Sequence, residues 1–103
     1  MKYNFNKVVT HLATGDVLTD EKNNDLTYST VIINSLLAQQ ANETLSGSQK
    51  FEYWKLAGRI KDAAEEVEIT TDEIKIIKDK ANLAYNTLVF GPLYKLLEED
   101  YVG

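Results

Sequence analysis

The side chains most suggestive of chemistry in this chain of 103 residues are basic and aromatic ones that alternate along one stretch. In order they are Lys50, Phe51, Tyr53, Trp54, Lys55, Arg59 and Lys61. Such a stretch can hold single-stranded nucleic acid, because rings stack on bases and cations contact phosphates. Helical spacing favours another interpretation. Phe51 and Trp54 fall on a stripe that we expect to face the core, whereas Lys55 and Arg59 follow a different, solvated face. Nucleic-acid binding through Lys50, Lys55, Arg59 and Lys61 is therefore kept as the alternative function.

A second candidate is acidic and lies in residues 62 to 73. It contains six carboxylates and no basic residue: Asp62, Glu65, Glu66, Glu68, Asp72 and Glu73. Paired carboxylates can bind Mg²⁺ or Ca²⁺, but the spaced loop with a glycine turn that is typical of such sites is missing. Asp72 and Glu73 suit the first turn of a helix, where the helix dipole favours negative charge. For Glu65 and Glu66 the sequence predicts solvent exposure or, as the functional interpretation, contact with a basic partner.

The sequence offers little for catalysis or for a cofactor. His11 is the only histidine and cysteine is absent, so sulfur-based zinc sites and a Cys/His pair are excluded. No nucleophile elbow, phosphate loop or dinucleotide fingerprint is present. A lone imidazole lacks the partner that acid–base work needs, so we interpret His11 as structural. We therefore expect a protein that is not an enzyme and binds neither cofactor nor metal.

Composition predicts one compact domain over residues 1–103. Hydrophobic residues make up 44% and charged residues 26%, which is typical of globular proteins. The net charge of −5 argues against a broad contact with a phosphate backbone. Neither a signal peptide nor an apolar run long enough for a membrane span is visible, so we expect a soluble, cytoplasmic protein.

Residues 1–25 form the least helical part of the chain. Residues flanking Thr14-Gly15-Asp16 are rich in β-branched types, and this turn signal predicts a hairpin with strands over 5–12 and 17–19. Residues 20–25 are polar throughout and predict a loop, with Asp25 or Thr27 placed to cap the helix that follows.

Residues 26–103 predict three helices, which makes the fold class α+β. The first runs from Leu26 to about Gln40; strand propensity in "STVII" is the competing interpretation. The second begins at a capping box, Ser46 with Gln49, and the third at another, Thr70 with Glu73. We expect the second helix to turn one apolar stripe toward the core, formed by Phe51, Trp54, Ala57, Ile60, Ala64 and Val67. We expect the third helix to offer an apolar seam to another helix, formed by Ile74, Ile77, Ala81, Ala84 and Leu88.

The C-terminal stretch "NTLVFGPLYKLLEED" raises the question of where the third helix breaks. Proline is unfavourable inside a helix but suits its first turn, so we expect the helix to end near Val89 or Phe90 and a short one to begin at Pro92. A continuous helix kinked at Gly91-Pro92 is the alternative. The short helix either closes the core or carries three residues to a partner or a second copy: Tyr94, Leu97 and Tyr101.

The order of three stretches resembles small proteins of unassigned function that are encoded by bacteriophages and prophages. These stretches are "HLATGDVLTDEKNNDLTYSTVIINSLLA", "FEYWKLAGRIK" and "FGPLYKLLEED". The resemblance implies a phage-type protein in the cytoplasm of a bacterial host and assigns no functional residue. We expect a non-enzymatic interaction protein that binds a protein partner, either as an inhibitor of a host or defence factor or as a virion-assembly accessory. Homo-oligomerisation is a further expectation.

Overall fold

A computed structural model describes residues 1–40 and 43–99. This part of the chain contains four helices and one two-stranded sheet, in the order β1 (Lys2–Tyr3), α1 (Tyr28–Leu37), α2 (Gly47–Asp62), β2 (Val67–Glu68), α3 (Thr71–Ala84) and α4 (Thr87–Glu99). The prediction of a mostly helical α+β chain is confirmed. The prediction of three helices is wrong, because the described residues form four.

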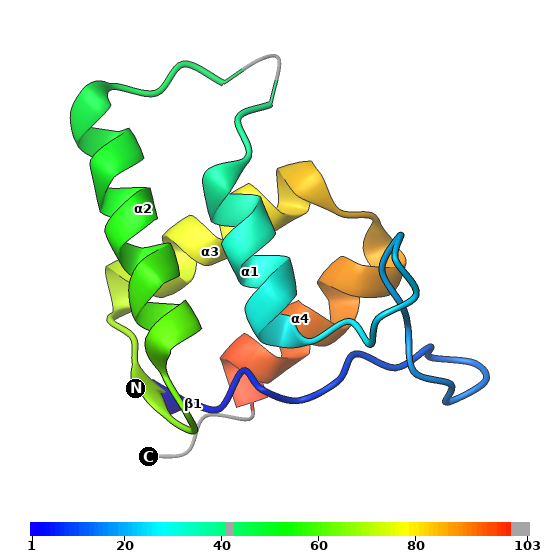
Figure 1. The fold of residues 1–103 in the computed structure, drawn as a ribbon. Helices are drawn as coiled ribbons and strands as arrows, with labels where there is room; N and C mark the ends of the chain where they lie inside the picture. Colours follow the sequence, from blue (N-terminus) through cyan, green and yellow to red (C-terminus); the bar gives the residue numbers. More distant parts are fainter. Residues whose placement is uncertain (41–42, 100–103) are drawn as a thin grey trace.

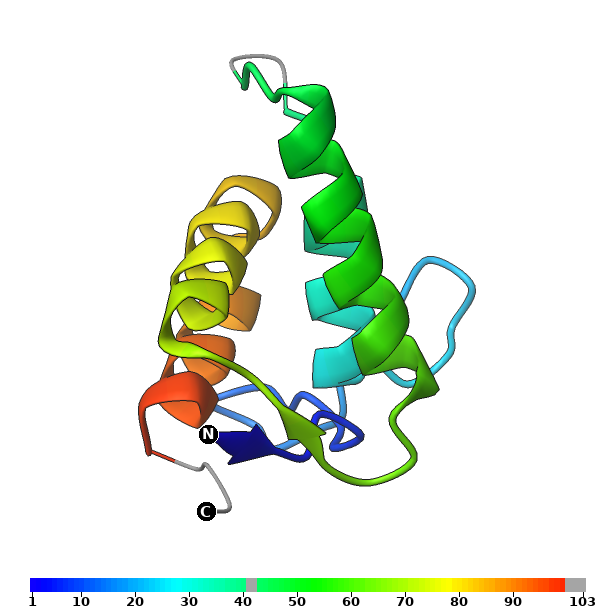
Figure 2. The same cartoon turned by 90° about the vertical axis from the view of Figure 1, so that its left-hand side faces the viewer.

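The helices pack in a chain of neighbours. α1 packs against both α2 and α3, and α3 packs against α4 (Figure 1). β1 lies beside the C-terminal end of α4, so the two ends of the described chain meet at one end of the molecule (Figure 1). At the opposite end, the first turns of α2 extend beyond α3 (Figure 2). The outer side of these first turns is therefore not covered by α3 or α4.

The predicted hairpin exists only as isolated pairings. A bridge joins Thr10 to Val17 across the expected turn, where Gly15 takes a φ of 75° that glycine adopts without strain. Two further bridges pair the same stretches with other segments: Val8 pairs with Thr27, and Thr19 pairs with Asp25. Because each stretch pairs with a different neighbour, no ladder forms, and strands over 5–12 and 17–19 are absent from the described chain. The sheet pairs β1 with β2 instead, with Lys2 opposite Glu68.

The two predicted capping boxes and the predicted cap at Thr27 are confirmed. At α2, the Ser46 hydroxyl accepts a hydrogen bond from the Gln49 N–H at 3.1 Å, and the Gln49 side chain accepts one from the Ser46 N–H at 2.9 Å. Thr70 and Glu73 do the same at α3, at 3.1 and 2.9 Å. Thr27 caps α1, so "STVII" is helical and the strand interpretation is wrong. Local side-chain to backbone bonds thus decide where these helices begin.

The predicted break at Gly91-Pro92 is wrong, because the chain breaks earlier. α3 ends at Ala84, and Tyr85 is extended with φ −130° and ψ 155°. The Asn86 carbonyl then accepts the N–H of Phe90 at 2.8 Å, and α4 runs on through Pro92. Pro92 leaves the Leu88 carbonyl without its usual helical donor. The alternative of one continuous third helix is wrong as well, because Pro92 lies inside a separate helix that begins at Thr87.

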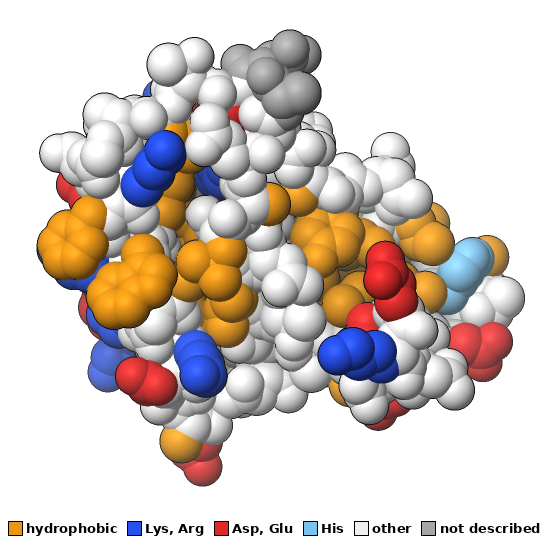
Figure 3. All heavy atoms as spheres, turned by 45° about the horizontal axis from the view of Figure 1, so that its top comes forward, with side chains coloured by type: hydrophobic (Ala, Val, Ile, Leu, Met, Phe, Trp, Pro, Cys, Tyr) orange, Lys and Arg blue, Asp and Glu red, His pale blue; other side chains and the backbone are white. Residues whose placement is uncertain are grey.

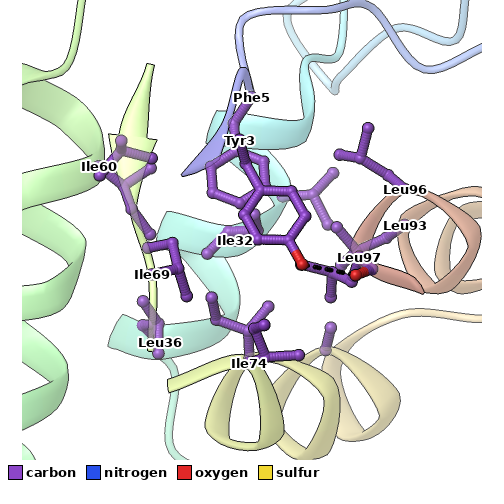
Figure 4. Packing of buried hydrophobic residues seen from close by; sticks show 14 of the residues in the cluster. Tyr3, Phe5, Ile32, Leu36, Ile60, Ile69, Ile74, Leu93, Leu96 and Leu97 are labelled. Carbon is purple, nitrogen blue, oxygen red and sulfur yellow. Dashed lines mark hydrogen bonds between the residues drawn. The ribbon is translucent and has the colours of Figure 1, made fainter. Parts of the chain in front are cut away.

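The buried apolar side chains form one cluster to which every helix and both strands contribute. Near the sheet, the Tyr3 hydroxyl donates a hydrogen bond of 2.6 Å to the Leu97 carbonyl and so ties β1 to α4 (Figure 4). The rings of Tyr3 and Phe5 stack with centroids 5.3 Å apart. Ile32 and Ile69 are also fully buried in this cluster. The core thus lies between the sheet, α1, α3 and α4, with α2 contributing from one side.

Candidate protein-binding surface

The structure disperses the C-terminal residues predicted to meet a partner. Tyr94 is exposed, with the Lys78 ammonium 4.5 Å from its ring centroid. Leu97 is only 2% exposed and belongs to the core, so its assignment to a binding surface is wrong. Tyr101 lies outside the described residues. The burial of Leu97 follows from its position on the side of α4 that meets β1, where its backbone carbonyl accepts the Tyr3 hydrogen bond.

The predicted acidic residues Glu65 and Glu66 are exposed in the connection between α2 and β2. Neither takes part in an ion pair within the described residues, whereas the neighbouring Glu68 pairs with the N-terminal amine at 3.0 Å. The Asn6 side chain donates to the carbonyls of residues 63 and 64, at 3.3 and 2.8 Å, and so holds the start of this connection. Contact of Glu65 and Glu66 with a basic partner stays a prediction.

The four basic residues predicted for nucleic acid do not act as one set. Arg59 donates to the Glu68 carbonyl at 2.9 Å and to the Glu73 carboxylate at 2.7 Å. It therefore ties α2 to β2 and to the start of α3, and its contact with phosphate stays a prediction. Lys50, Lys55 and Lys61 are exposed, as is Arg59. Unlike Arg59, these three lysines make no ion pair within the described residues.

The largest difference from the prediction concerns Phe51 and Trp54, which do not face the core. They are 58% and 64% exposed. Their rings lie nearly parallel, with centroids 6.1 Å apart, and the Lys55 ammonium is 5.0 Å from the centroid of Phe51. We call these two residues the aromatic face. Figure 3 shows hydrophobic side chains gathered beside lysines on this part of the surface.

The core-facing side of α2 is set by Leu56, Ala57 and Ile60, all buried. At 100° per residue, Trp54 lies about 200° around the helix from Leu56, on the opposite side. The alternative stripe that includes Leu56 also has helical spacing, so spacing alone did not decide which side turns inward. Because the first half of α2 extends beyond α3, the side chains on its outer side are left exposed (Figure 2).

A hollow of about 290 Å³ lies next to the aromatic face, between the end of α1 and the start of α2. We call it the α1–α2 groove; its lining residues are Leu36, Leu37, Ala38, Gln39, Leu45, Lys50, Tyr53 and Trp54. Leu37 is 57% exposed at its edge. Within the part of the chain that the structure describes, Lys50 is the only charged residue in this lining. The groove is therefore an apolar depression with one cation at its rim.

One wall of the α1–α2 groove is held by a partly buried ion pair. Lys80 on α3 is only 3% exposed, and its ammonium donates to the Ala38 carbonyl at 2.5 Å and to the Glu43 carboxylate at 2.7 Å. The Gln40 N–H also donates to that carboxylate at 2.8 Å. These bonds, first from Gln40 and then from Lys80, lower the pKa of Glu43 below its ordinary value. The sequence did not predict the burial of Lys80, because a lysine on a helix with many polar residues is expected to face solvent.

A second groove lies on the other side of α2, between α2 and α3, and has a volume of about 370 Å³. Its lining residues are Glu52, Lys55, Leu56, Arg59, Asp72, Glu73 and Ile76. Here acidic and basic side chains mix, and Arg59 and Glu73 pair within it. In this α2–α3 groove, acidic and basic side chains therefore partly neutralise one another, unlike in the α1–α2 groove.

The described residues contain no cluster of three or more His, Cys, Asp or Glu side chains placed to hold a metal ion. None of the described helices combines the length and apolar character that crossing a membrane requires. His11 has a local role, because its Nδ1 accepts the backbone N–H groups of Ala13 and Thr14 at 3.1 and 3.4 Å. No family model, curated protein or solved structure matches this chain.

Proposed function

We propose that this chain is a non-enzymatic protein-binding domain whose contact surface is the aromatic face together with the α1–α2 groove. The observation that carries this proposal is the exposure of Phe51 and Trp54 beside an apolar hollow. Large exposed apolar patches on small domains are typical of interaction sites, and tryptophan is enriched among the residues that dominate binding energy. Leu37 extends the same patch across the groove.

The polar bonds that anchor this surface support the proposal. The Lys80 ammonium binds the Ala38 carbonyl and the Glu43 carboxylate, and the capping box at Ser46 defines the start of α2. A preformed surface loses little conformational entropy when a partner binds. The groove and the aromatic face are therefore suited to receive an apolar side chain from another protein without first rearranging.

Nucleic-acid binding is the second candidate, and one observation favours it. Phe51 and Trp54 are exposed beside Lys50 and Lys55, the combination that holds single-stranded nucleic acid. Three features favour a protein partner over it. Arg59 is engaged within the fold, the Lys55 ammonium already lies over the Phe51 ring, and the net charge is −5.

The resemblance to phage-encoded proteins supplies the proposed setting. The partner would then be a host or defence factor that the domain inhibits, or a component of an assembling virion, in the cytoplasm of a bacterial host. A second copy of the chain is the remaining protein partner that such a surface can receive.

Site-specific photocrosslinking in bacterial cells tests the proposal. A photoreactive phenylalanine analogue replaces Phe51 in one version of the chain and Tyr94, which is exposed on α4, in the control. We expect protein adducts from position 51 and few from position 94. Adducts that nuclease treatment removes would favour the second candidate. Equal yields from both positions, or none from position 51, would overturn the proposal.

A further inference from the structure

The charge around the α1–α2 groove has the opposite sign to that of the chain as a whole. The chain has 16 acidic and 11 basic residues, yet among the described residues no carboxylate lines this groove and Lys50 does. The neighbouring α2–α3 groove contains Glu52, Asp72 and Glu73. The apolar hollow is therefore a basic site on an acidic molecule.

Lys50, Trp54 and Lys61 lie along one side of α2. Their spacings of four and seven residues correspond to about one and two helical turns, so Lys50 and Lys61 stand about 16 Å apart along the axis with Trp54 between them. Glu52, by contrast, lies on the side of α2 that lines the α2–α3 groove. The two lysines thus lie on the side of α2 that carries Trp54, with Lys50 in the lining of the groove and Lys61 near the C-terminal end of the helix.

These lysines make no ion pair within residues 1–40 and 43–99. The pairs found there join Met1 to Glu68, Arg59 to Glu73, Lys78 to Glu98, and Lys80 to Glu43. Both Lys50 and Lys61 are exposed, so their charges are available to an incoming group. An apolar hollow with one unpaired cation in its lining, and a second further along the same side of α2, is complementary to a segment that combines apolar side chains with carboxylates.

We infer that the partner contacts this surface through an acidic amphipathic segment. Its apolar side chain enters the α1–α2 groove against Trp54 and Leu37, and its carboxylates meet Lys50 and Lys61. A helix of about three turns spans the 16 Å between the two lysines, and helices commonly dock in apolar grooves in this way. This inference rests on the proposed function, because it names the chemistry of the partner at the same surface.

Selection from a random twelve-residue peptide library tests the inference. The library is sorted against the purified full chain and counter-sorted against the variant Phe51→Ser/Trp54→Ser. We expect the enriched peptides to combine Asp or Glu with Leu, Ile or Phe. Trp54 is the only tryptophan in the chain, so its fluorescence measures the binding of each enriched peptide directly at the site.

Charge reversal then separates the inference from the proposed function. The variant Lys50→Glu/Lys61→Glu should weaken an enriched peptide at least about tenfold, and added salt should weaken it in the wild type. The matched control is Lys75→Glu, an exposed lysine on α3, which should leave the affinity unchanged. Peptides that need Phe51 and Trp54 but lack acidic residues and ignore the two lysines would overturn the inference and leave the proposed function standing.

Two further outcomes count against both proposals. If no enriched peptide depends on Phe51 and Trp54, the surface is not a peptide-binding site. If a labelled oligothymidine changes Trp54 fluorescence more strongly than any enriched peptide, with a steep salt dependence, the surface binds nucleic acid. Light scattering during the same titrations detects a second copy, and a stable dimer that occupies the groove would also exclude the peptide.

Discussion

The two ends of this molecule treat large apolar side chains in opposite ways. At the end formed by β1, β2 and α4, the closed end, Tyr3, Phe5 and Leu97 are buried. The other end, which we call the projecting end, is formed by the last turn of α1, residues 43–46 and the first half of α2. There Leu37, Phe51 and Trp54 are each more than half exposed. The closed end has strands and a second helix to cover its side chains, whereas α2 at the projecting end extends beyond α3.

The comparison shows that the projecting end is held largely by polar bonds. The Lys80 ammonium binds the Ala38 carbonyl and the Glu43 carboxylate, and Ser46 with Gln49 closes a capping box. These bonds order the backbone without burying the outer side of α2. Apolar side chains there can consequently remain available for a partner.

The largest expected effect comes from the closed end. Leu97→Ala leaves a cavity beside Tyr3 in a packed core, so we expect a loss of about 2 to 5 kcal/mol in the free energy of unfolding. Urea unfolding followed by far-ultraviolet circular dichroism measures it. Leu37→Ala is the matched control at the projecting end, where we expect a loss below about 1 kcal/mol. Similar losses for both variants would contradict the contrast between the two ends.

An intermediate effect is expected where α3 holds the projecting end. Lys80→Met removes the donor to the Ala38 carbonyl and the Glu43 carboxylate, so the free energy of unfolding should fall by about 1 to 3 kcal/mol. The same substitution at Lys75, which is exposed on α3, serves as control and should cost little. An equal effect at both lysines would show that the partly buried pair contributes nothing specific.

A smaller effect should follow acidification. The pKa of Glu43 is lowered by the hydrogen bonds from Gln40 and Lys80; burial raises the pKa of Glu73, but bonds from Arg59 and Thr70 outweigh it and lower the pKa overall. Since the folded state favours ionised carboxylates, their contribution to stability is present above the ordinary pKa of 4.5 and is lost as pH falls through the lowered values.

Thermal unfolding at a series of pH values below neutrality measures this loss. Glu43→Gln should make the melting temperature less sensitive to acid, because the substituted side chain no longer titrates. Glu65→Gln is the control, since Glu65 is exposed and makes no ion pair within the described residues. An acid response that is unchanged in Glu43→Gln would argue against a role for this pair in acid stability.

The smallest effect on stability is expected at the aromatic face itself. The variant Phe51→Ser/Trp54→Ser removes rings that are mostly in water, so the free energy of unfolding should change by less than about 1 kcal/mol. Circular dichroism measures it, because the variant lacks the only tryptophan. A loss of several kcal/mol would place these rings in the core and remove the distinction between the two ends.

Local patterns predicted the helix starts well and the tertiary faces poorly. Thr27, Ser46 and Thr70 begin their helices as predicted, since a cap bonds backbone groups only a few residues away. The turn at Gly15 was also correct, but its strands did not form, because neighbouring backbone groups pair with residues 25 and 27 as well. Leu97 and Trp54 were assigned to the wrong environments because each helix offers more than one plausible apolar side.

The C-terminal region shows why proline alone did not locate the break. An extended Tyr85 separates α3 from α4 and the Asn86 carbonyl begins the new helix, whereas Pro92 is accommodated inside it. The side of α4 formed by Leu93, Leu96 and Leu97 is buried against the core. That burial can offset the one backbone hydrogen bond that Pro92 cannot make.

The sequence by itself determined that most of the described chain after residue 26 is helical, together with three capped helix starts, the net charge and the absence of thiol chemistry. Tertiary structure alone decided which side of each helix is dry, where the third helix ends, that Arg59 and Lys80 bind within the fold, and that Phe51 and Trp54 face solvent. Caps and turns depend on contacts between close neighbours in the chain. The orientation of a helix depends instead on which distant elements cover it, and at the projecting end no element of α3 or α4 covers the outer side of α2.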